Sequence, residues 1–399
     1  MKLNLKHKLL LLCIVFAQNF AFASTAALEV ENAIVKYLAS HPLNATYLVA
    51  EKDEVLSKGS MGYFSFEKKK HLEPDQIMPI ASGTKPMTAA AILRLNDKGL
   101  LKITDTVAKH LPASSKVWPN DQVPEWAEKI TLHQLLTHTS GLAEYIPGLK
   151  IDITKEHHDI NKEIVKFAVD NPLQFTPGKE YRYCNTGFVM LGLIIENVSK
   201  KSFGEFLKSE FFDPLKMKST FLVSFDVALK YQQNQLTDIY PMRYFAIPTG
   251  KEPQFVPVNS DFILSPFADG GVISNVEDLY KWNTALHEGR LLSEASYTLM
   301  TTPYVPAPDR GGLETHMGYG LFISKLKDGQ IYYNHGGNAL AIRSEYGYLP
   351  ELKAALMILS NVMVQIPEDM TGKVNMDLPA NQIDIIYFRN AILDALTKK

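Results

Sequence analysis

The stretch that decides the fold is residues 331–360, IYYNHGGNALAIRSEYGYLPELKAALMILS. It contains three runs of β-branched, aromatic and aliphatic residues, as strands do: Ile331–Asn334, Ala339–Tyr348 and Ala354–Ser360. Between the first two runs stands His335-Gly336-Gly337-Asn338, and Pro350-Glu351 follows the second. Both connections are rich in turn-forming residues. The stretch therefore predicts three successive strands of an antiparallel sheet.

The N-terminal part of the chain supplies further elements for this sheet. Apolar residues at helical spacing predict a helix over Ala26–Leu38, and Thr46–Ala50 and Gly62–Phe66 predict two strands that form a hairpin. A closing helix is predicted at Ile383–Leu396. The two ends of the chain are therefore expected to build one sheet flanked by helices.

The middle of the chain is mostly helical. Helices are predicted at Met87–Leu95, Leu132–Leu136 and Phe188–Val198, and a further helix after Gly270-Gly271 would begin at a capping box formed by Ser274 and Glu277. This order predicts an α/β (α+β) protein with a sheet lobe, at about 24–79 and 270–399, and an all-helical lobe, at about 80–269. Residues 24–399 would form one domain, with the ligand site in the cleft between its lobes.

Composition excludes several classes of function. The chain has 399 residues, of which 46% are hydrophobic and 21% charged, and its formal net charge is only -2. A core of ample size is expected, whereas a nucleic-acid partner is not, because the basic excess that binds phosphates is missing.

The first 23 residues have the form of a secretory signal peptide. Lysines precede an apolar run over Leu9–Ala17, and Ala21-Phe22-Ala23 supplies small residues for cleavage after Ala23. The run is too short to span a bilayer, so no transmembrane segment is expected in the mature chain. Cleavage would leave Cys184 as the only cysteine, without a disulfide partner. The sequence predicts a periplasmic or secreted protein.

Ser82-Gly83-Thr84-Lys85 is the first candidate for chemistry. The same Ser-x-x-Lys spacing recurs at Ser65 and Ser324, but only Ser82 precedes a strongly apolar helix. A serine and a lysine one helical turn later share a face, and a lysine shielded from water can act as a base toward the hydroxyl. The alternative is an ordinary capping serine with a solvated lysine.

Two further patterns contain candidate site residues. Tyr183-Cys184-Asn185 opens a predicted helix, so that Tyr183 and Asn185 can both point into one cleft; alternatively Tyr183 is a core aromatic and Asn185 a helix cap. His335-Gly336-Gly337 is predicted to join two strands, where glycine permits close approach of a backbone or ligand. Its alternative is a structural turn histidine.

Together, Ser-x-x-Lys, Tyr-x-Asn and His-x-Gly resemble the motifs of the penicillin-recognising serine hydrolases. That family comprises class C β-lactamases, serine D-Ala-D-Ala carboxypeptidases and related esterases and D-aminopeptidases. The resemblance runs from about Ala45 to Ser360 and includes LHQLLTHTSGL (132–142), FTPGKEYRYCNTGFVMLG (175–192) and GGVISNVEDL (270–279). It implies a β-lactamase/transpeptidase-like fold.

The resemblance also implies an acyl-enzyme cycle without a cofactor or a metal. Ser82 would attack a carbonyl while Lys85 and Tyr183 move its proton, and which of the two is the base stays open. The remaining implied roles are substrate binding by Asn185, His335 and Gly337, and oxyanion binding by the backbone N–H groups of Ser82 and Asn338. The expected substrate is a small molecule or a peptidoglycan-derived peptide.

Two departures from the family pattern bear on the substrate. Class C β-lactamases usually carry lysine where this chain has His335, and Gly336 stands where serine or threonine is usual. Histidine here resembles the carboxypeptidase, D-aminopeptidase and esterase branches. We therefore expect D-Ala-D-Ala carboxypeptidase or β-lactamase-like amide hydrolysis, with a short-chain esterase as the alternative and a non-catalytic binder as a third. The cation that holds a substrate carboxylate stays open among His335, Lys325 and Arg343, and so does the oligomeric state.

Overall fold

The computed structural model describes residues 24–41, 43–146, 148–149, 157–232, 235–236, 238–247, 253–258, 267–339, 341–364 and 384–398. The predicted signal peptide, residues 1–23, lies outside these ranges. Among the described residues, no helix is both long and apolar enough to cross a membrane.

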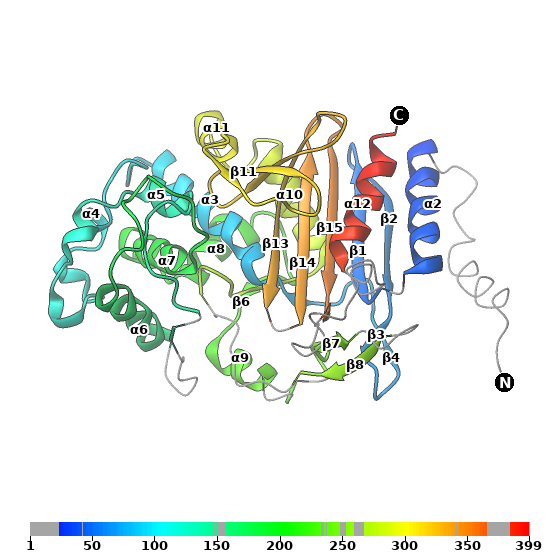
Figure 1. The fold of residues 1–399 in the computed structure, drawn as a ribbon, viewed down its shortest axis with the longest axis horizontal. Coiled ribbons are helices and arrows are strands. Elements are labelled where there is room, and N and C mark those ends of the chain that lie inside the picture. Colours follow the sequence, from blue (N-terminus) through cyan, green and yellow to red (C-terminus); the bar gives the residue numbers. More distant parts are fainter. Residues whose placement is uncertain are drawn as a thin grey trace.

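An eight-stranded sheet forms the centre of the protein, and every neighbouring pair in it is antiparallel (Figure 1). In spatial order its strands are β10 (Val305–Ala307), β11 (Glu314–Met317), β12 (Phe322–Lys325), β13 (Ile331–Ala339), β14 (Ile342–Leu349), β15 (Ala354–Ser360), β1 (Ala45–Glu51) and β2 (Glu54–Met61). The two ends of the chain meet where β1 pairs with β15, Thr46 opposite Leu359. The prediction of one antiparallel sheet built from both termini is confirmed.

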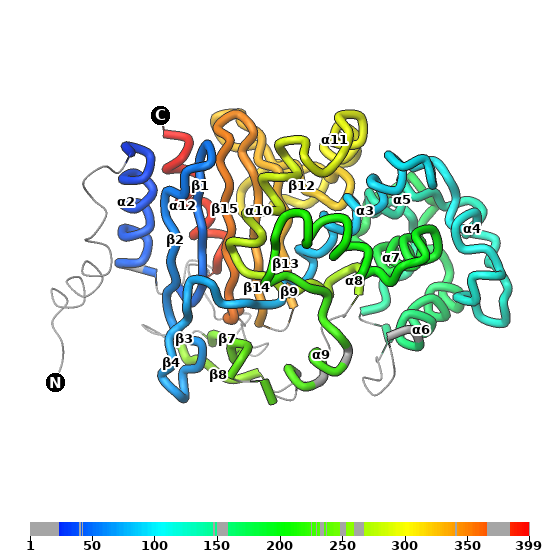
Figure 2. Tube along the Cα trace, turned by 180° about the vertical axis from the view of Figure 1, so that it is seen from behind, coloured from blue at the N-terminus to red at the C-terminus, as the bar shows by residue number. Residues whose placement is uncertain are grey.

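Helices cover both faces of this sheet, which Figures 1 and 2 show from opposite sides. Tyr47 and Val49 of β1 pack into a core with α2 (Thr25–Ser40) and α12 (Ile385–Leu396). Leu48 and Ala50 point the other way, into the core shared with α10 (Val276–His287). Because side chains alternate along a strand and both faces are covered, all seven residues of β1 are buried.

The helical part lies at the side of the sheet opposite α2 (Figure 1). Its α helices are α3 (Lys85–Asp97), α4 (Val107–His110), α5 (Leu132–Leu136), α6 (His157–Asp170), α7 (Asn185–Ser199), α8 (Phe203–Leu207) and α9 (Phe225–Gln232), and α11 (Glu294–Thr301) packs against α3. Short 3₁₀ helices occupy Ala81–Thr84, Ala113–Ser115, Pro119–Asp121 and Glu125–Glu128, and a π turn occupies Lys208–Phe212. The helices predicted at 87–95, 132–136 and 188–198 are present within α3, α5 and α7.

Three small sheets complete the fold. They are β3 (Tyr63–Ser65) with β4 (Lys70–His71); β5 (Met78–Pro79), β9 (Val272–Ser274) and β6 (Phe221–Leu222); and β16 (Val362–Val364), β7 (Tyr244–Ile247) and β8 (Gln254–Pro257). The second of these connects the start of the helical part to the segment before α10.

Three predicted details are wrong. The hairpin partner of β1 is β2, not Gly62–Phe66. The sequence does not indicate β2 because it is an edge strand whose partly exposed polar residues hide the strand pattern. His335–Asn338 lies inside β13, and the chain turns instead near Ala341, whose φ is +66°. The cap of α10 is Asn275, whose side chain accepts a hydrogen bond from the Asp278 N–H, while Ser274 ends β9.

Candidate active site

Ser82 lies in the 3₁₀ turn Ala81–Thr84 that leads into α3. The preceding Ala81 has a φ of +46°, an uncommon conformation for a residue with a side chain, and neighbouring elements hold the turn in place. The Ser344 hydroxyl donates to Ile80 O at 2.7 Å, and the Tyr346 hydroxyl donates to Gly83 O at 2.5 Å. The nucleophile candidate therefore stands on a turn fixed to β14.

Lys85 is the first residue of α3, and its side chain is fully buried beneath Ser82. Its Nζ donates to Ser82 Oγ at 3.1 Å, to Asn185 Oδ1 at 2.7 Å and to the Asp269 carbonyl at 2.6 Å. These three contacts surround the nitrogen and fix its position beside Ser82. The alternative of a solvated lysine is excluded.

Tyr183 precedes α7, with its ring above Lys85 and toward the His335 ring. Lys85 Nζ lies 5.1 Å from the Tyr183 ring centroid, and the rings of Tyr183 and His335 are 6.4 Å apart. Asn185 begins α7, where its backbone N–H donates to the Glu144 carboxylate. Tyr183 and Asn185 thus approach the Ser82–Lys85 pair from the helical part.

His138 positions Tyr183 through one contact with its ring and two hydrogen bonds to the backbone of the adjacent residues. Its ring stacks on the Tyr183 ring at 4.3 Å, its Nδ1 accepts a hydrogen bond from the Cys184 N–H at 3.0 Å, and its carbonyl accepts one from the Arg182 N–H at 3.0 Å. Burial, and then the charge of Lys85, lower the pKa of His138 well below its ordinary value. Since Nδ1 accepts, the single ring proton lies on Nε2, which has no partner.

Cys184 is buried next to Tyr183. Its Sγ donates to the Leu142 carbonyl at 3.5 Å, and burial raises the pKa of its thiol to about 12. It is the free cysteine of the described chain.

Strand β13 forms the wall of the site opposite Tyr183. It pairs with β12 only as far as Asn334, so from His335 onward it pairs with β14 alone. Gly337 passes close to the Ser82 turn: a Cβ at this position would lie 2.1 Å from Ile80 O. Glycine is therefore required for the approach of β13 to the nucleophile candidate.

His335 is buried and neutral. Its Nδ1 lies 2.7 Å from Gly336 O, its Nε2 has no partner, and burial, with Arg310 and Lys85 nearby, lowers its pKa well below its ordinary value. It therefore supplies no fixed positive charge. Of the other two cation candidates, Arg343 donates to Asp384 at 2.8 Å, and Lys325 is exposed on β12.

These groups surround one cavity of about 630 Å³. The predicted site residues Ser82, Tyr183, Asn185, His335, Gly337 and Asn338 all line it, and Lys85 lies below Ser82. The other lining residues are Ile146, Tyr181, Arg182, Pro308, Asp309, Arg310, Phe322, Gly336, Arg343, Ser344, Glu345 and Ile386. Lys325 is not one of them. Within the described part of the chain, no cluster of three His, Cys, Asp or Glu side chains is arranged to hold a metal.

Sequence reasoning missed Arg310, Glu345 and His138 as parts of the site. Arg310 is on the loop between β10 and β11, and Glu345 is on β14 opposite Gly336. Neither belongs to a motif. A signal did exist for His138, because it stands in the LHQLLTHTSGL segment that resembles the family.

The sequence of this chain matches a known protein family and individual relatives within it. The family model described as Beta-lactamase matches residues 30–380. The chain is 29% identical over 304 residues to Penicillin-binding protein 4* of Bacillus subtilis (strain 168), an alignment that covers 74% of this chain and 63% of that protein. The chain thus spans less than two thirds of this relative's length.

Solved structures share the fold. D-amino acid amidase from Ochrobactrum anthropi SV3, in complex with L-phenylalanine amide, superposes with a TM-score of 0.74 at 22% identity, covering 94% of this chain and 99% of that one. EstCE1, a hydrolase with promiscuous acyltransferase activity, superposes with a TM-score of 0.66 at 19% identity, covering 92% and 98%. At these identities the likeness concerns the fold.

Proposed function

The chain belongs to the beta-lactamase family, whose members are serine hydrolases, and from this premise we propose that it is an exported hydrolase that forms an acyl-enzyme on Ser82. Its substrate class would be a D-amino-acid amide, hydrolysed as by a D-Ala-D-Ala carboxypeptidase or a β-lactamase. The observation that carries the proposal is the 3.1 Å hydrogen bond between Lys85 Nζ and Ser82 Oγ at the floor of the cavity.

Lys85 and Tyr183 are the groups proposed to move the proton of Ser82. As Ser82 Oγ bonds to the substrate carbonyl carbon, its proton passes to one of them and then to the leaving nitrogen, which departs as an amine. Water then attacks the ester, the acid product leaves, and Ser82 regains its proton. Lys85 reaches Ser82 directly, whereas the ring of Tyr183 lies above Lys85.

The tetrahedral intermediate needs donors for its oxyanion. We assign these to the backbone N–H groups of Ser82 and Asn338, two residues that line the cavity from the Ala81–Thr84 turn and from β13. Loss of one such donor typically lowers the rate by ~100- to 1000-fold. Asn185, tied to Lys85 at 2.7 Å, would orient the amide side of the substrate, and Gly337 would let the substrate lie against β13.

An esterase acting on short acyl esters is the second candidate. It is favoured by the neutrality of His335, because an ester needs no cation for a carboxylate. The two candidates make different predictions on three substrates: an acyl-D-Ala-D-Ala peptide, a chromogenic cephalosporin and a nitrophenyl ester. Hydrolysis of the peptide or cephalosporin supports the amide hydrolase, and hydrolysis of the nitrophenyl ester alone supports the esterase.

The nucleophile is tested by mass spectrometry after incubation with a penicillin or a fluorophosphonate. The wild-type protein should gain one covalent adduct on the peptide that contains Ser82, and Ser82→Ala should gain none while its melting temperature stays nearly unchanged. Ser65→Ala is the matched control, because Ser65 also has a lysine three residues later but does not line the cavity. A wild-type protein that gains no adduct would instead be a non-catalytic binder.

Export is proposed from the first 23 residues. The protein recovered from the periplasm or medium of an expressing bacterium should begin at Ser24, and N-terminal sequencing checks this. Recovery in the cytoplasm with Met1 retained would contradict it.

A further inference from the structure

An arginine absent from the sequence motifs faces the cavity beside β13. The loop between β10 and β11 carries Arg310 across the end of β12, where its guanidinium lies 4.2 Å from the centroid of the Phe322 ring. Its side chain is 25% exposed and lines the same cavity as Ser82. The guanidinium is therefore within reach of a molecule bound there.

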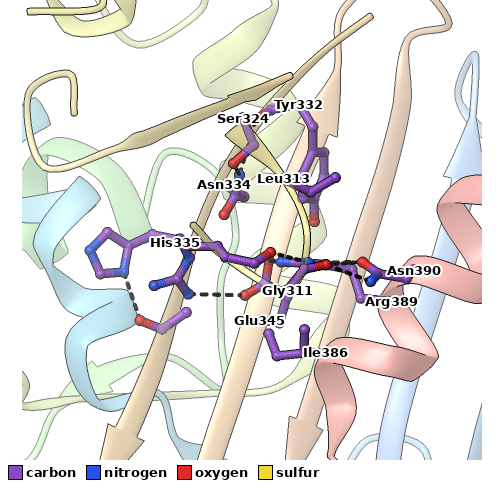
Figure 3. Close-up of polar contacts among 12 residues, drawn as sticks. Gly311, Leu313, Ser324, Tyr332, Asn334, His335, Glu345, Ile386, Arg389 and Asn390 are labelled. Carbon is purple, nitrogen blue, oxygen red and sulfur yellow. Dashed lines mark hydrogen bonds and ion pairs between the residues drawn. The ribbon is translucent and has the colours of Figure 1, made fainter. Parts of the chain in front are cut away.

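Arg310 belongs to a triad with Glu345 and Arg389. Glu345 is completely buried, with Arg310 Nη2 at 3.6 Å from one oxygen and Arg389 Nη1 at 3.4 Å from the other. Figure 3 shows Glu345 beside Arg389, with Asn390 next to them. Two cations thus share one carboxylate, which leaves one positive charge of the triad uncompensated by Glu345.

The two arginines are held very differently. Arg389 is fully buried and donates to Arg310 O at 2.6 Å and to Asn390 Oδ1 at 2.8 and 3.1 Å, besides its contact with Glu345. Besides its contact with the Phe322 ring, Arg310 has only the 3.6 Å approach to Glu345, which is longer than a hydrogen bond, and its Nε has no hydrogen-bond partner. If Arg310 turned toward a ligand, Arg389 would still neutralise Glu345. Arg310 is the displaceable member of the triad.

Among the other charges of the cavity wall, Arg343 and Asp309 have polar partners. Arg343 donates to Asp384 at 2.8 Å, and the Asp309 carboxylate accepts the Gly312 N–H at 2.6 Å. Arg182 is exposed on the opposite side, where its guanidinium lies 5.7 Å from the Phe175 ring centroid. Beside β13, an incoming anion therefore meets Arg310.

Gly336 explains why the triad can approach the site. A Cβ at this position would lie 2.5 Å from the Ser344 carbonyl oxygen, 2.7 Å from Glu345 Oε2 and 3.3 Å from Arg310 Nη2. A serine or threonine, usual at the middle of this motif in the resembling family, would collide with the ion pair. In this chain the space of that side chain is taken by the Ser344 carbonyl, Glu345 and Arg310.

We propose that Arg310 binds the carboxylate of an anionic substrate in the Ser82 cavity. On binding, its guanidinium would leave the 3.6 Å contact with Glu345 and form a bidentate contact with the substrate carboxylate. The proposal rests on the proposed function, and it narrows the substrate class to acyl peptides that end in a free D-amino acid. Arginine suits this role, since its planar fork matches two carboxylate oxygens.

The test compares N-acyl-D-Ala-D-Ala with its neutral C-terminal amide. In Arg310→Gln, kcat/KM for the acid should fall roughly 10- to 100-fold, mainly through KM, the usual range for a hydrogen bond to a charged group. The amide should change less than about threefold, and Arg310→Lys should recover part of the loss for the acid. Arg343→Gln is the matched control, because Arg343 also lines the cavity but already has a carboxylate partner; it should leave the acid-to-amide ratio unchanged.

Binding to Ser82→Ala separates this proposal from the catalytic one. Calorimetry with N-acetyl-D-alanine and N-acetyl-D-alaninamide should show preference for the acid, and Arg310→Gln in the same background should abolish it. That result supports the carboxylate site even if wild-type protein hydrolyses neither peptide. An equal fall for acid and amide, or loss of the preference in Arg343→Gln, would overturn the assignment to Arg310.

Discussion

Replacing His138 tests how precisely Tyr183 must be held. His138→Asn removes the ring but suits the backbone, since the φ of His138 is +57° and asparagine is among the residues that best tolerate this conformation. His138→Phe retains an aromatic face for Tyr183 but cannot accept the Cys184 N–H. His138→Asn therefore loses both contacts, whereas His138→Phe loses the hydrogen bond alone and adds backbone strain at this φ.

The structure gives the size of each effect. Loss of the Nδ1 acceptor leaves the buried Cys184 N–H unpaired, at a cost of about 1–3 kcal/mol of stability in either variant. Loss of the stacked ring adds about 0.5–1.5 kcal/mol in His138→Asn. If Tyr183 then shifts by about 1 Å, a displacement of that size lowers the catalytic rate by ~100-fold.

Stopped-flow measurement of acyl-enzyme formation, alongside urea unfolding, is the assay. We expect the acylation rate to fall roughly 10- to 100-fold in His138→Asn, less in His138→Phe, with KM within about threefold of the wild-type value. A purely structural histidine would lower the free energy of unfolding and leave the acylation rate of the folded protein unchanged. That outcome in both variants would refute the positioning role.

Three further changes have definite expected results. Tyr183→Phe keeps the ring on His138 but removes the phenol, so kcat should fall roughly 100- to 10,000-fold with little change in melting temperature. Gly337→Ala places a methyl group against Ile80 O and must separate β13 from the Ser82 turn; steady-state kinetics should show a ~100-fold loss, and an unchanged rate would contradict the close approach. Burial lowers the pKa of His287 to about 3, so the unfolded chain takes up its proton from pH ~6.5 downward while the folded protein does not. Stability should therefore fall with decreasing pH, by about 1.4 kcal/mol per unit for this histidine between those values. Urea unfolding at pH 7.5 and 5 should show a smaller difference in His287→Phe than in wild type, and an equal difference would exclude His287 as a source.

Most of the sheet could be predicted because its central strands are strongly apolar. Ala354–Ser360 is buried on both faces, and its run of aliphatic residues has a strand pattern that is hard to mistake. Strand β2 was missed because Glu54, Lys58 and Ser60 make an edge strand resemble a loop. The pattern of His335–Asn338 predicts a turn, since two successive glycines usually indicate one; in the structure these glycines instead allow β13 to approach its neighbours closely.

Part of the candidate site could also be predicted from the sequence, and part could not. Ser82, Lys85, Tyr183 and Asn185 occur in short motifs, and the structure brings them together as the motifs suggested. Arg310 could not be found, because its position depends on how a loop crosses the end of β12. No local pattern encodes such a contact between distant segments.

The burial of Cys184 has a practical consequence. Reaction with iodoacetamide requires a thiolate in contact with solvent, and a thiol with a pKa of about 12 in a closed environment provides neither. Folded molecules from which Cys13 has been removed with the first 23 residues should therefore resist alkylation and intermolecular cross-linking, and modification should proceed only as fast as the segment around Tyr183 opens. The rate at which Cys184 is alkylated can therefore measure how often the cavity wall opens, without an introduced label.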